Sequence, residues 1–148
     1  MVELTYNNVQ TIPSGQAAVF NTVIACPCRH VLHANESSVI TMMGTPNTRD
    51  ACFATYDLDF KANIALSEGA TVGPIAVTIS NEGEALQIAQ AIVTPAAVGD
   101  YFNVSCTAVL NVPKGCCAHV GVENISVGTT TNPSIDMQNA VLKINQTR

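Results

Sequence analysis

The sequence predicts an all-β protein built as an antiparallel β-sandwich or jelly roll. The first observation is the segment from Cys52 to Leu66, where apolar and polar residues alternate almost without interruption. A period of two places every apolar side chain on one face of an extended strand. The second observation is that turn residues such as Gly, Pro and Asn recur about every 10 to 15 residues, with no crossover helix between them. A sheet with one dry and one wet face is typically antiparallel.

Short apolar or alternating runs in the first third of the chain each predict a short strand between turns. The run at residues 17–24 places Ala18, Phe20 and Ile24 on one side. Pro27 cannot donate to a sheet ladder, so residues 25–29 are expected to form a loop or a bend. In chain order, the expected strands are residues 2–6, 9–12, 17–24, 30–33 and 39–43.

The centre of the chain holds the longest expected strand, residues 52–66, followed by two strands that a hairpin joins. Residues 72–80 are apolar on both sides, which is typical of a central strand. The segment Asn81-Glu82-Gly83-Glu84 is a hairpin-type connection. Residues 85–93 also fit a two-turn helix, but their short length and the hairpin signal before them favour a strand.

The last third of the chain predicts a hairpin and a final strand. Cys106 shares one strand face with Phe102, Val104, Ala108 and Leu110, so its thiol is expected to be buried and unreactive. In order, the expected elements are the strand 102–110, the turn 112–115, a return strand with Cys116, Ala118, Val120 and Val122 on one face, a Gly/Thr/Pro-rich loop 127–134 and the strand 135–144.

The chain is expected to form a single domain, residues 1–148, which is long enough to bury a core. Hydrophobic residues make up 47% of it and charged residues only 11%, whereas roughly a quarter is usual for a soluble domain. So few charges are not enough to cover the surface of a monomer. We therefore expect part of the surface to be buried against copies of the chain or against another protein.

Charge and hydropathy exclude several classes of partner. The net charge is −5, with only six Lys and Arg residues and no basic stripe, so nucleic-acid binding is not expected. No run approaches the ~20 apolar residues of a transmembrane helix, so no membrane partner is expected. Residues 1–6 lack the basic and apolar regions of a secretory signal, which predicts folding in a reducing bacterial cytoplasm with the cysteines as thiols.

Cys26, Cys28 and His30 form the sharpest chemical candidate, because thiolates and an imidazole at close spacing can bind zinc. The Cys-x-Cys spacing is tighter than in standard zinc motifs, so these residues are weak metal candidates. Small cysteines buried on sheet faces are the simpler interpretation. A third interpretation is oxidation after release to air, which would join Cys26 or Cys28 by a disulfide to the Cys116-Cys117 pair. The residues available to complete a zinc shell are Cys52, Cys106, Cys116, Cys117 and His119.

No catalytic motif surrounds a candidate nucleophile in this sequence. Asp57 and Asp59 lie on one polar strand face, as a glycosidase pair would, but Lys61 in register beside them indicates a solvated face. Residues 69–73 lack the Gly-Lys-Ser/Thr ending of a phosphate-binding loop. We therefore predict that the protein is not an enzyme and that it has no catalytic residues, no cofactor and no metal.

Four segments of the chain resemble a group of small proteins encoded in phages and prophages of gut Firmicutes. Related domains, similar to the tumour-necrosis-factor/C1q-like (TNF/C1q-like) jelly roll, cap collagen-like surface proteins in the same bacteria. The resemblance implies a trimeric jelly roll with a structural or adhesive role, and it carries no catalytic residues. The segments that carry it are residues 7–15 (NNVQTIPSG), 91–105 (AIVTPAAVGDYFNVS), 112–117 (VPKGCC) and 137–142 (MQNAVL).

Two functions fit this resemblance. The first is a virion structural protein, a capsid decoration or auxiliary head protein of a tailed phage that binds the major capsid protein or another virion protein. The second is a receptor- or glycan-binding head of a phage fibre or bacterial surface protein. A binding head is typically held on a coiled-coil or Gly-x-y shaft, and this sequence contains neither. We therefore expect a homotrimeric decoration protein located in the virion, with the binding head as the alternative.

Overall fold

The computed structural model describes residues 1–23 and 29–148, which form eleven β-strands. No α-helix occurs in these residues, so the predicted all-β class is confirmed. For the same residues, no segment forms a helix that could cross a membrane. In chain order the strands are β1 (Val2–Tyr6), β2 (Gln10–Ile12), β3 (Thr22–Val23), β4 (Val31–His33), β5 (Ile40–Met43), β6 (Phe53–Leu66), β7 (Ile75–Asn81), β8 (Glu84–Val93), β9 (Phe102–Pro113), β10 (Cys117–Asn124) and β11 (Ile135–Gln146).

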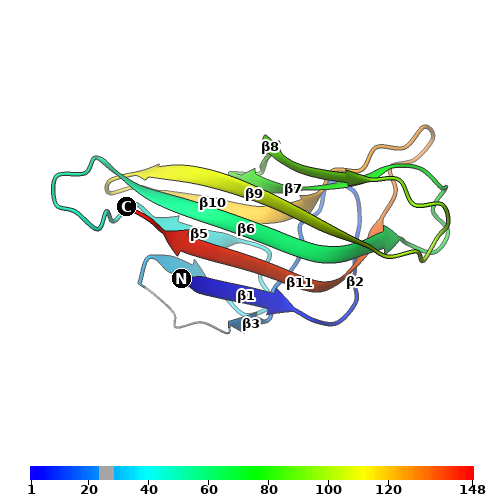
Figure 1. The fold of residues 1–148 in the computed structure, drawn as a ribbon, viewed down its shortest axis with the longest axis horizontal. Coiled ribbons are helices and arrows are strands. Elements are labelled where there is room, and N and C mark those ends of the chain that lie inside the picture. The colour runs from blue at the N-terminus through cyan, green and yellow to red at the C-terminus, as the bar shows by residue number, and fades with distance from the viewer. Residues whose placement is uncertain (24–28) are drawn as a thin grey trace.

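The strands form two antiparallel sheets that pack against each other as a sandwich (Figure 1). The six-stranded sheet has the order β3-β1-β11-β6-β9, and β2 also pairs with β11. The five-stranded sheet has the order β4-β5-β10-β7-β8. One hydrophobic core fills the space between the sheets. The predicted antiparallel β-sandwich is therefore confirmed.

β6 runs through the centre of the six-stranded sheet, with β11 on one side and β9 on the other. The alternating apolar positions from Ala54 to Leu66 are at most 1% exposed, which confirms the dry face that the alternation predicts. Burying a large apolar side chain stabilises the fold by roughly 1.5–3 kcal/mol, so this strand is a main source of stability. The buried residues on this face are Ala54, Tyr56, Leu58, Phe60, Ala62, Ile64 and Leu66.

A β-bulge interrupts β11 at Asn139, where the register with β6 shifts between Gln138 and Val141. Asn139 has a φ of +53°, a backbone conformation that asparagine adopts more readily than most residues. Because of the extra residue, odd-numbered residues face the core before the bulge and even-numbered residues face it after the bulge. As a result β11 keeps one face on the core along its whole length. The buried positions are 135 and 137 before the bulge and 140, 142 and 144 after it.

The strand predicted over residues 17–24 is wrong for most of its length, because this segment crosses from one sheet to the other. Ala17 forms an isolated bridge with Glu123 of β10, in the five-stranded sheet. Only Thr22 and Val23 form a strand, which pairs with β1 in the six-stranded sheet. The predicted inward positions Ala18 and Phe20 are fully buried. Ile24 lies outside the described residues.

β8 is a strand and not a helix, as the hairpin signal before it predicts. Its hairpin with β7 turns at Glu82 and Gly83, which have φ values of +54° and +80°. Two successive positive φ values are the signature of a type I′ turn, which matches the twist of the flanking strands. The adjoining strand β7 begins at Ile75, three residues later than the start predicted at residue 72.

The pairing of β7 with β8 is irregular beyond the hairpin. Ser80 lies opposite Ala85, whereas Thr78 lies opposite Gln90, so β8 contains extra residues between these pairs. The fully buried Thr78 hydroxyl lies 2.9 Å from the carbonyl oxygen of Leu86 and 3.2 Å from that of Ala89. The hydroxyl has a single proton, so it donates to one of these carbonyl oxygens at a time, at the place where the ladder is interrupted.

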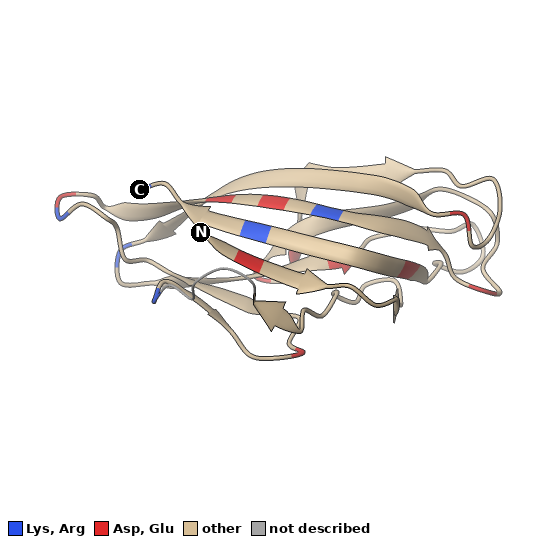
Figure 2. Cartoon of the chain, turned by 60° about the horizontal axis from the view of Figure 1, so that its bottom comes forward, with Lys and Arg blue, Asp and Glu red and all other residues tan. Residues whose placement is uncertain are grey.

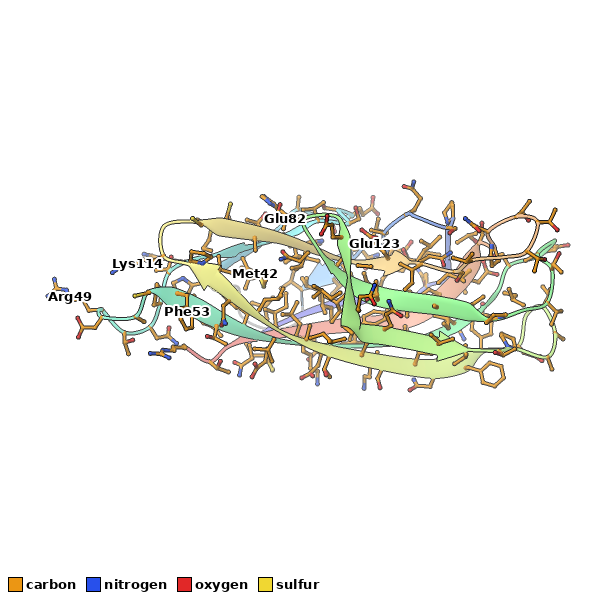
Figure 3. All side chains as sticks on the ribbon, turned by 90° about the horizontal axis from the view of Figure 1, so that it is seen from above. Met42, Arg49, Phe53, Glu82, Lys114 and Glu123 are labelled. Atoms are coloured by element: carbon orange, nitrogen blue, oxygen red, sulfur yellow. The ribbon has the colours of Figure 1, made fainter. Side chains whose placement is uncertain are left out.

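The two ends of the sandwich differ in charge (Figures 2 and 3). The end that holds both termini, which we call the terminal end, carries basic residues (Figures 1 and 2). The opposite end, formed by the loops 67–74, 94–101 and 127–134, is called the loop end and is acidic (Figure 2). Arg49 and Lys114 lie at the terminal end (Figure 3), and the loops that form the loop end include Glu68 and Asp100.

Candidate functional site

The cysteines and histidines that the sequence singles out do not form a metal site in the described residues. Cys26 and Cys28 lie outside these residues, so the zinc and disulfide hypotheses that involve them stay predictions. His30 is half-buried, and its carbonyl oxygen accepts a hydrogen bond from the Met43 amide at 2.8 Å. Of the four cysteines that the structure describes, Cys52, Cys116 and Cys117 are exposed. Cys116 was expected on the return strand, on the same face as Ala118, Val120 and Val122, but it precedes β10 in a turn.

Cys106 is buried, as its place on β9 predicts, and only 6% of its surface is exposed. It lies opposite Phe60 in the pairing of β9 with β6. Burial raises the pKa of the Cys106 thiol to about 11, against a smaller opposing effect of a hydrogen bond with the Ile79 backbone. A thiol with so high a pKa is a poor nucleophile at neutral pH. Cys106 is therefore a core residue.

His119 and Glu82 form an exposed pair that joins the β7–β8 hairpin to β10. The His119 amide donates to Glu82 Oε1 at 2.8 Å, and Nδ1 of the ring lies 3.2 Å from the same oxygen. The Glu82 amide donates to the His119 carbonyl oxygen at 2.8 Å. The hydrogen bonds from His119 lower the pKa of the Glu82 carboxyl, and the bond from the His119 backbone amide has the largest effect. The arrangement holds the hairpin in place and contains no nucleophile.

Asp57 and Asp59 lie on the outer face of β6, where the sequence places them. In the register of the sheet, Asp59 lies opposite Lys143 of β11 and Thr107 of β9. Neighbouring positions on this face form cross-strand side-chain hydrogen bonds, such as that from Thr55 Oγ1 to Asn111 Oδ1 at 2.8 Å. The two carboxylates thus lie on a polar outer face, in line with the solvated face predicted.

A cavity with a volume of about 350 Å³ lies at the loop end. Two loops that are far apart in the sequence form its walls, one before β7 and one between β10 and β11. We call this cavity the end groove. The residues that line it are Thr71, Val72, Gly73, Pro74, Val127, Gly128, Thr129, Thr130, Thr131 and Pro133.

Ser126 fixes the base of the end groove from within the protein. This serine is 1% exposed and immediately precedes the second wall. Its hydroxyl oxygen accepts a hydrogen bond from the Ala76 amide at 2.9 Å and lies 3.3 Å from the Ala76 carbonyl oxygen. Since Ala76 follows the first wall by only two residues, this one side chain joins both walls at their base.

Asn124 anchors the far end of the second wall. Its side chain is fully buried, and Nδ2 donates to the carbonyl oxygens of Ile12 at 2.9 Å and Pro133 at 3.0 Å. Oδ1 accepts from the Ser126 amide at 2.9 Å. Buried polar groups that are fully hydrogen-bonded make a local structure rigid and specific. The end groove is therefore a preformed feature of the fold.

The end groove is not predicted by the sequence. Residues 127–134 indicate only a loop, and residues 69–73 resemble only an incomplete phosphate-binding loop. Neither segment carries a motif alone, and the chain between them is long enough that sequence spacing does not indicate their contact. The one available signal is that both segments are rich in Gly and Thr.

Comparison with known proteins identifies the fold. No protein-family model and no curated protein sequence matches this chain. Among solved structures, the globular domain of zebrafish complement 1qA protein is similar, with 14% identity, a TM-score of 0.65 and coverage of 99% of this chain and 96% of that one. Eiger TNF from S. frugiperda has 11% identity and a TM-score of 0.63, covering 100% of this chain and 92% of that one.

A third similar structure is murine APRIL at pH 5.0, with 11% identity and a TM-score of 0.57, covering 93% of this chain and 96% of that one. These likenesses span nearly the whole chain, so the fold is the C1q/TNF-like jelly roll, as the sequence resemblance implied. At such low identity they establish the fold alone. The phage origin and the trimeric state stay predictions.

Proposed function

We propose that this protein is a non-enzymatic homotrimer that decorates the head of a tailed phage, where it binds the major capsid protein or another virion protein. Its place would then be the virion. The fold supports this proposal, because C1q/TNF-like domains are typically binding domains without catalytic activity and commonly form trimers. The low charged fraction of 11% also favours docking between proteins over binding to nucleic acid.

The observation that carries the trimer is the free edge of the sandwich along β8 and β9. Both strands end their sheets on the same side, and no described strand pairs with their outer edges (Figure 1). Ile88 and Ile92 on β8 are 85% and 63% exposed, and Val109 on β9 is 59% exposed. An edge strand with exposed apolar side chains is normally covered. Symmetry-related copies of the chain would cover it.

Sedimentation of a matched pair of variants tests the trimer. Ile88→Asp combined with Ile92→Asp places two charges on the β8 edge and should convert a trimer into folded monomers at micromolar concentration. Leu32→Asp, at a 53% exposed position on β4, introduces the same charge elsewhere and should leave the trimer intact. A wild-type protein that sediments as a monomer would contradict the proposal.

Co-sedimentation with phage particles that lack the protein tests the decoration function. The wild-type trimer should pellet with the particles, since three weak contacts on one rigid body gain strength through effective concentration. The monomeric Ile88→Asp/Ile92→Asp variant should stay in the supernatant. Wild-type protein that stays in the supernatant in saturating amounts would refute decoration.

The second candidate function is a receptor- or glycan-binding head, and the end groove favours it. This groove lies at the end of the sandwich opposite both termini (Figure 1). A domain attached through either terminus would therefore present the groove outward. Binding of the wild-type protein to host cells or glycans, without binding to particles, would establish this function in place of decoration.

A further inference from the structure

The residues that line the end groove are all uncharged, which limits the ligands it can hold. Four of them are threonines, and the others are Gly, Val and Pro. The basic residues of the terminal end lie at the opposite end of the molecule (Figure 2). Glu68 lines a smaller adjoining depression of about 200 Å³, and its charge is negative. Anionic ligands such as phosphates need cationic partners, and this groove provides none.

The groove is amphipathic. Thr71, Thr129, Thr130 and Thr131 are exposed, and within the part of the chain that the structure describes no hydrogen bond occupies their hydroxyls. Val72 and Val127 are 51% and 73% exposed in the same walls. A ligand that fits must therefore offer both hydroxyl groups and C–H surfaces, and it must carry no charge.

We infer that the end groove is a binding site for a neutral saccharide. Sugar hydroxyls would exchange hydrogen bonds with the threonine hydroxyls and the backbone of the two walls, while the C–H faces of the ring would pack on Val72 and Val127. The volume of about 350 Å³ is within the range of small-molecule sites, roughly 300–1,000 Å³. The inference rests on the second candidate function, whose site and ligand class it names.

The rigidity of the walls supports this assignment, because a preformed site binds without the cost of ordering its loops. Beyond the hydrogen bonds of Ser126 and Asn124, the Gly128 amide donates to Asn132 Oδ1 at 3.2 Å within the second wall. The loop is also tightly folded at this glycine. A Cβ atom at position 128 would lie 1.9 Å from the Thr131 carbonyl oxygen, so only glycine fits there.

Gly73 provides a variant that blocks the groove without disturbing the fold. It lines the groove, and a Cβ atom added there meets no other atom within 4 Å. Gly73→Leu should therefore fill the cavity and leave the protein folded. Thr130→Val is the milder variant, since it removes one hydroxyl at nearly constant shape. Thr48→Val makes the same change at an exposed threonine of the terminal end and serves as the matched control.

The experiment is a titration of the ¹⁵N-labelled trimer or monomer with neutral oligosaccharides terminated by glucose, galactose, mannose, N-acetylglucosamine or N-acetylgalactosamine, and with their sialylated and sulfated forms. At least one neutral saccharide should shift the amide resonances of residues 71–73 and 127–131. Gly73→Leu should weaken binding at least tenfold, Thr130→Val should weaken it severalfold, and Thr48→Val should leave it unchanged.

Three outcomes would overturn the inference: no neutral saccharide shifts these resonances, a sialylated or sulfated form binds more tightly than its neutral parent, or Gly73→Leu binds as well as wild type. Cell binding is measured in parallel, so that failure of the saccharide site can be distinguished from failure of the receptor-binding function. A protein that binds host cells equally well with and without Gly73→Leu would keep the receptor-binding function and lose the saccharide site. Co-sedimentation with particles is expected to be unaffected by Gly73→Leu.

Discussion

β6 and β8 are both long strands with many apolar residues, but they contribute to the molecule in different ways. β6 is paired on both sides and buries every second side chain, from Ala54 to Leu66. β8 is paired only with β7, its ladder is interrupted, and it exposes Ile88 and Ile92. Alternation of apolar and polar residues is therefore informative where a strand has one dry face and two partners. Where apolar residues break the alternation on an edge strand, they indicate a surface for another molecule.

The largest expected effect comes from truncating one apolar side chain to alanine in β6 and one in β8. Phe60 on β6 is 1% exposed, and replacing a fully buried phenylalanine with alanine costs about 3–5 kcal/mol of unfolding free energy. Ile88→Ala on β8, studied at a concentration where the chain is monomeric, should change it by no more than about 0.5 kcal/mol. Urea unfolding followed by circular dichroism gives both values. Equal losses would show that β8 is part of the core.

A second prediction concerns the interruption in β8. Thr78→Val removes the hydroxyl that lies near the Leu86 and Ala89 carbonyl oxygens and leaves these buried groups without that partner. The expected loss is about 1–3 kcal/mol. Hydrogen exchange should become faster for the amides of β8 and stay unchanged for those of β6. Uniform acceleration in both strands would mean that the side chain supports the whole sandwich rather than this edge.

The third prediction uses Cys106, which lies opposite Phe60 in the sheet. With a pKa of about 11, only about one thousandth of this thiol is ionised at pH 8. A thiol reagent added to the native protein at pH 8 should therefore label the exposed Cys52, Cys116 and Cys117 well before Cys106. Labelling of Cys106 should rise as the pH approaches 11 or when urea unfolds the chain. Mass spectrometry of labelled peptides checks the order.

The smallest expected effect is at Glu82, in the turn before β8. The native hydrogen bonds lower the pKa of Glu82 below the unfolded value of 4.5. The ionised carboxylate therefore stabilises the fold above pH 4.5, and this contribution is lost as the pH falls through the lowered pKa. Glu82→Gln should be slightly less stable than wild type at pH 7 and equally stable in acid, by thermal unfolding at both pH values. Glu84→Gln, at an exposed position two residues further along the chain, is the control.

The strands of the sandwich could be predicted from the sequence where a local rule decides the structure. The face of β6, the buried position of Cys106 and the hairpin at Glu82 all follow from alternation or turn chemistry within a few residues. The crossing segment at residues 17–23 could not be predicted, because its apolar pattern is the same for a strand and for a chain that passes between two sheets.

The candidate site was beyond prediction for a related reason. The two walls of the end groove meet only because β7 and β10 are neighbours in the five-stranded sheet, and sheet order is not encoded in any local pattern. Asn124 and Ser126, which fix the groove, are among the few polar residues that are buried in the described part of the chain. In a sequence they are indistinguishable from solvent-exposed residues at the end of a strand. Their role follows only from the hydrogen bonds that they form.

The bulge at Asn139 has a consequence for how this strand can change in evolution. Removing one residue there would reverse the orientation of every side chain that follows in β11, so that Leu142 and Ile144 would face water and Lys143 would face the core. A protein that lost Asn139 would therefore have to gain a residue nearby. Otherwise, the apolar and polar positions in the part of β11 after the bulge would all have to be exchanged. The number of residues between Met137 and Ala140 is thus constrained more strictly than their identity.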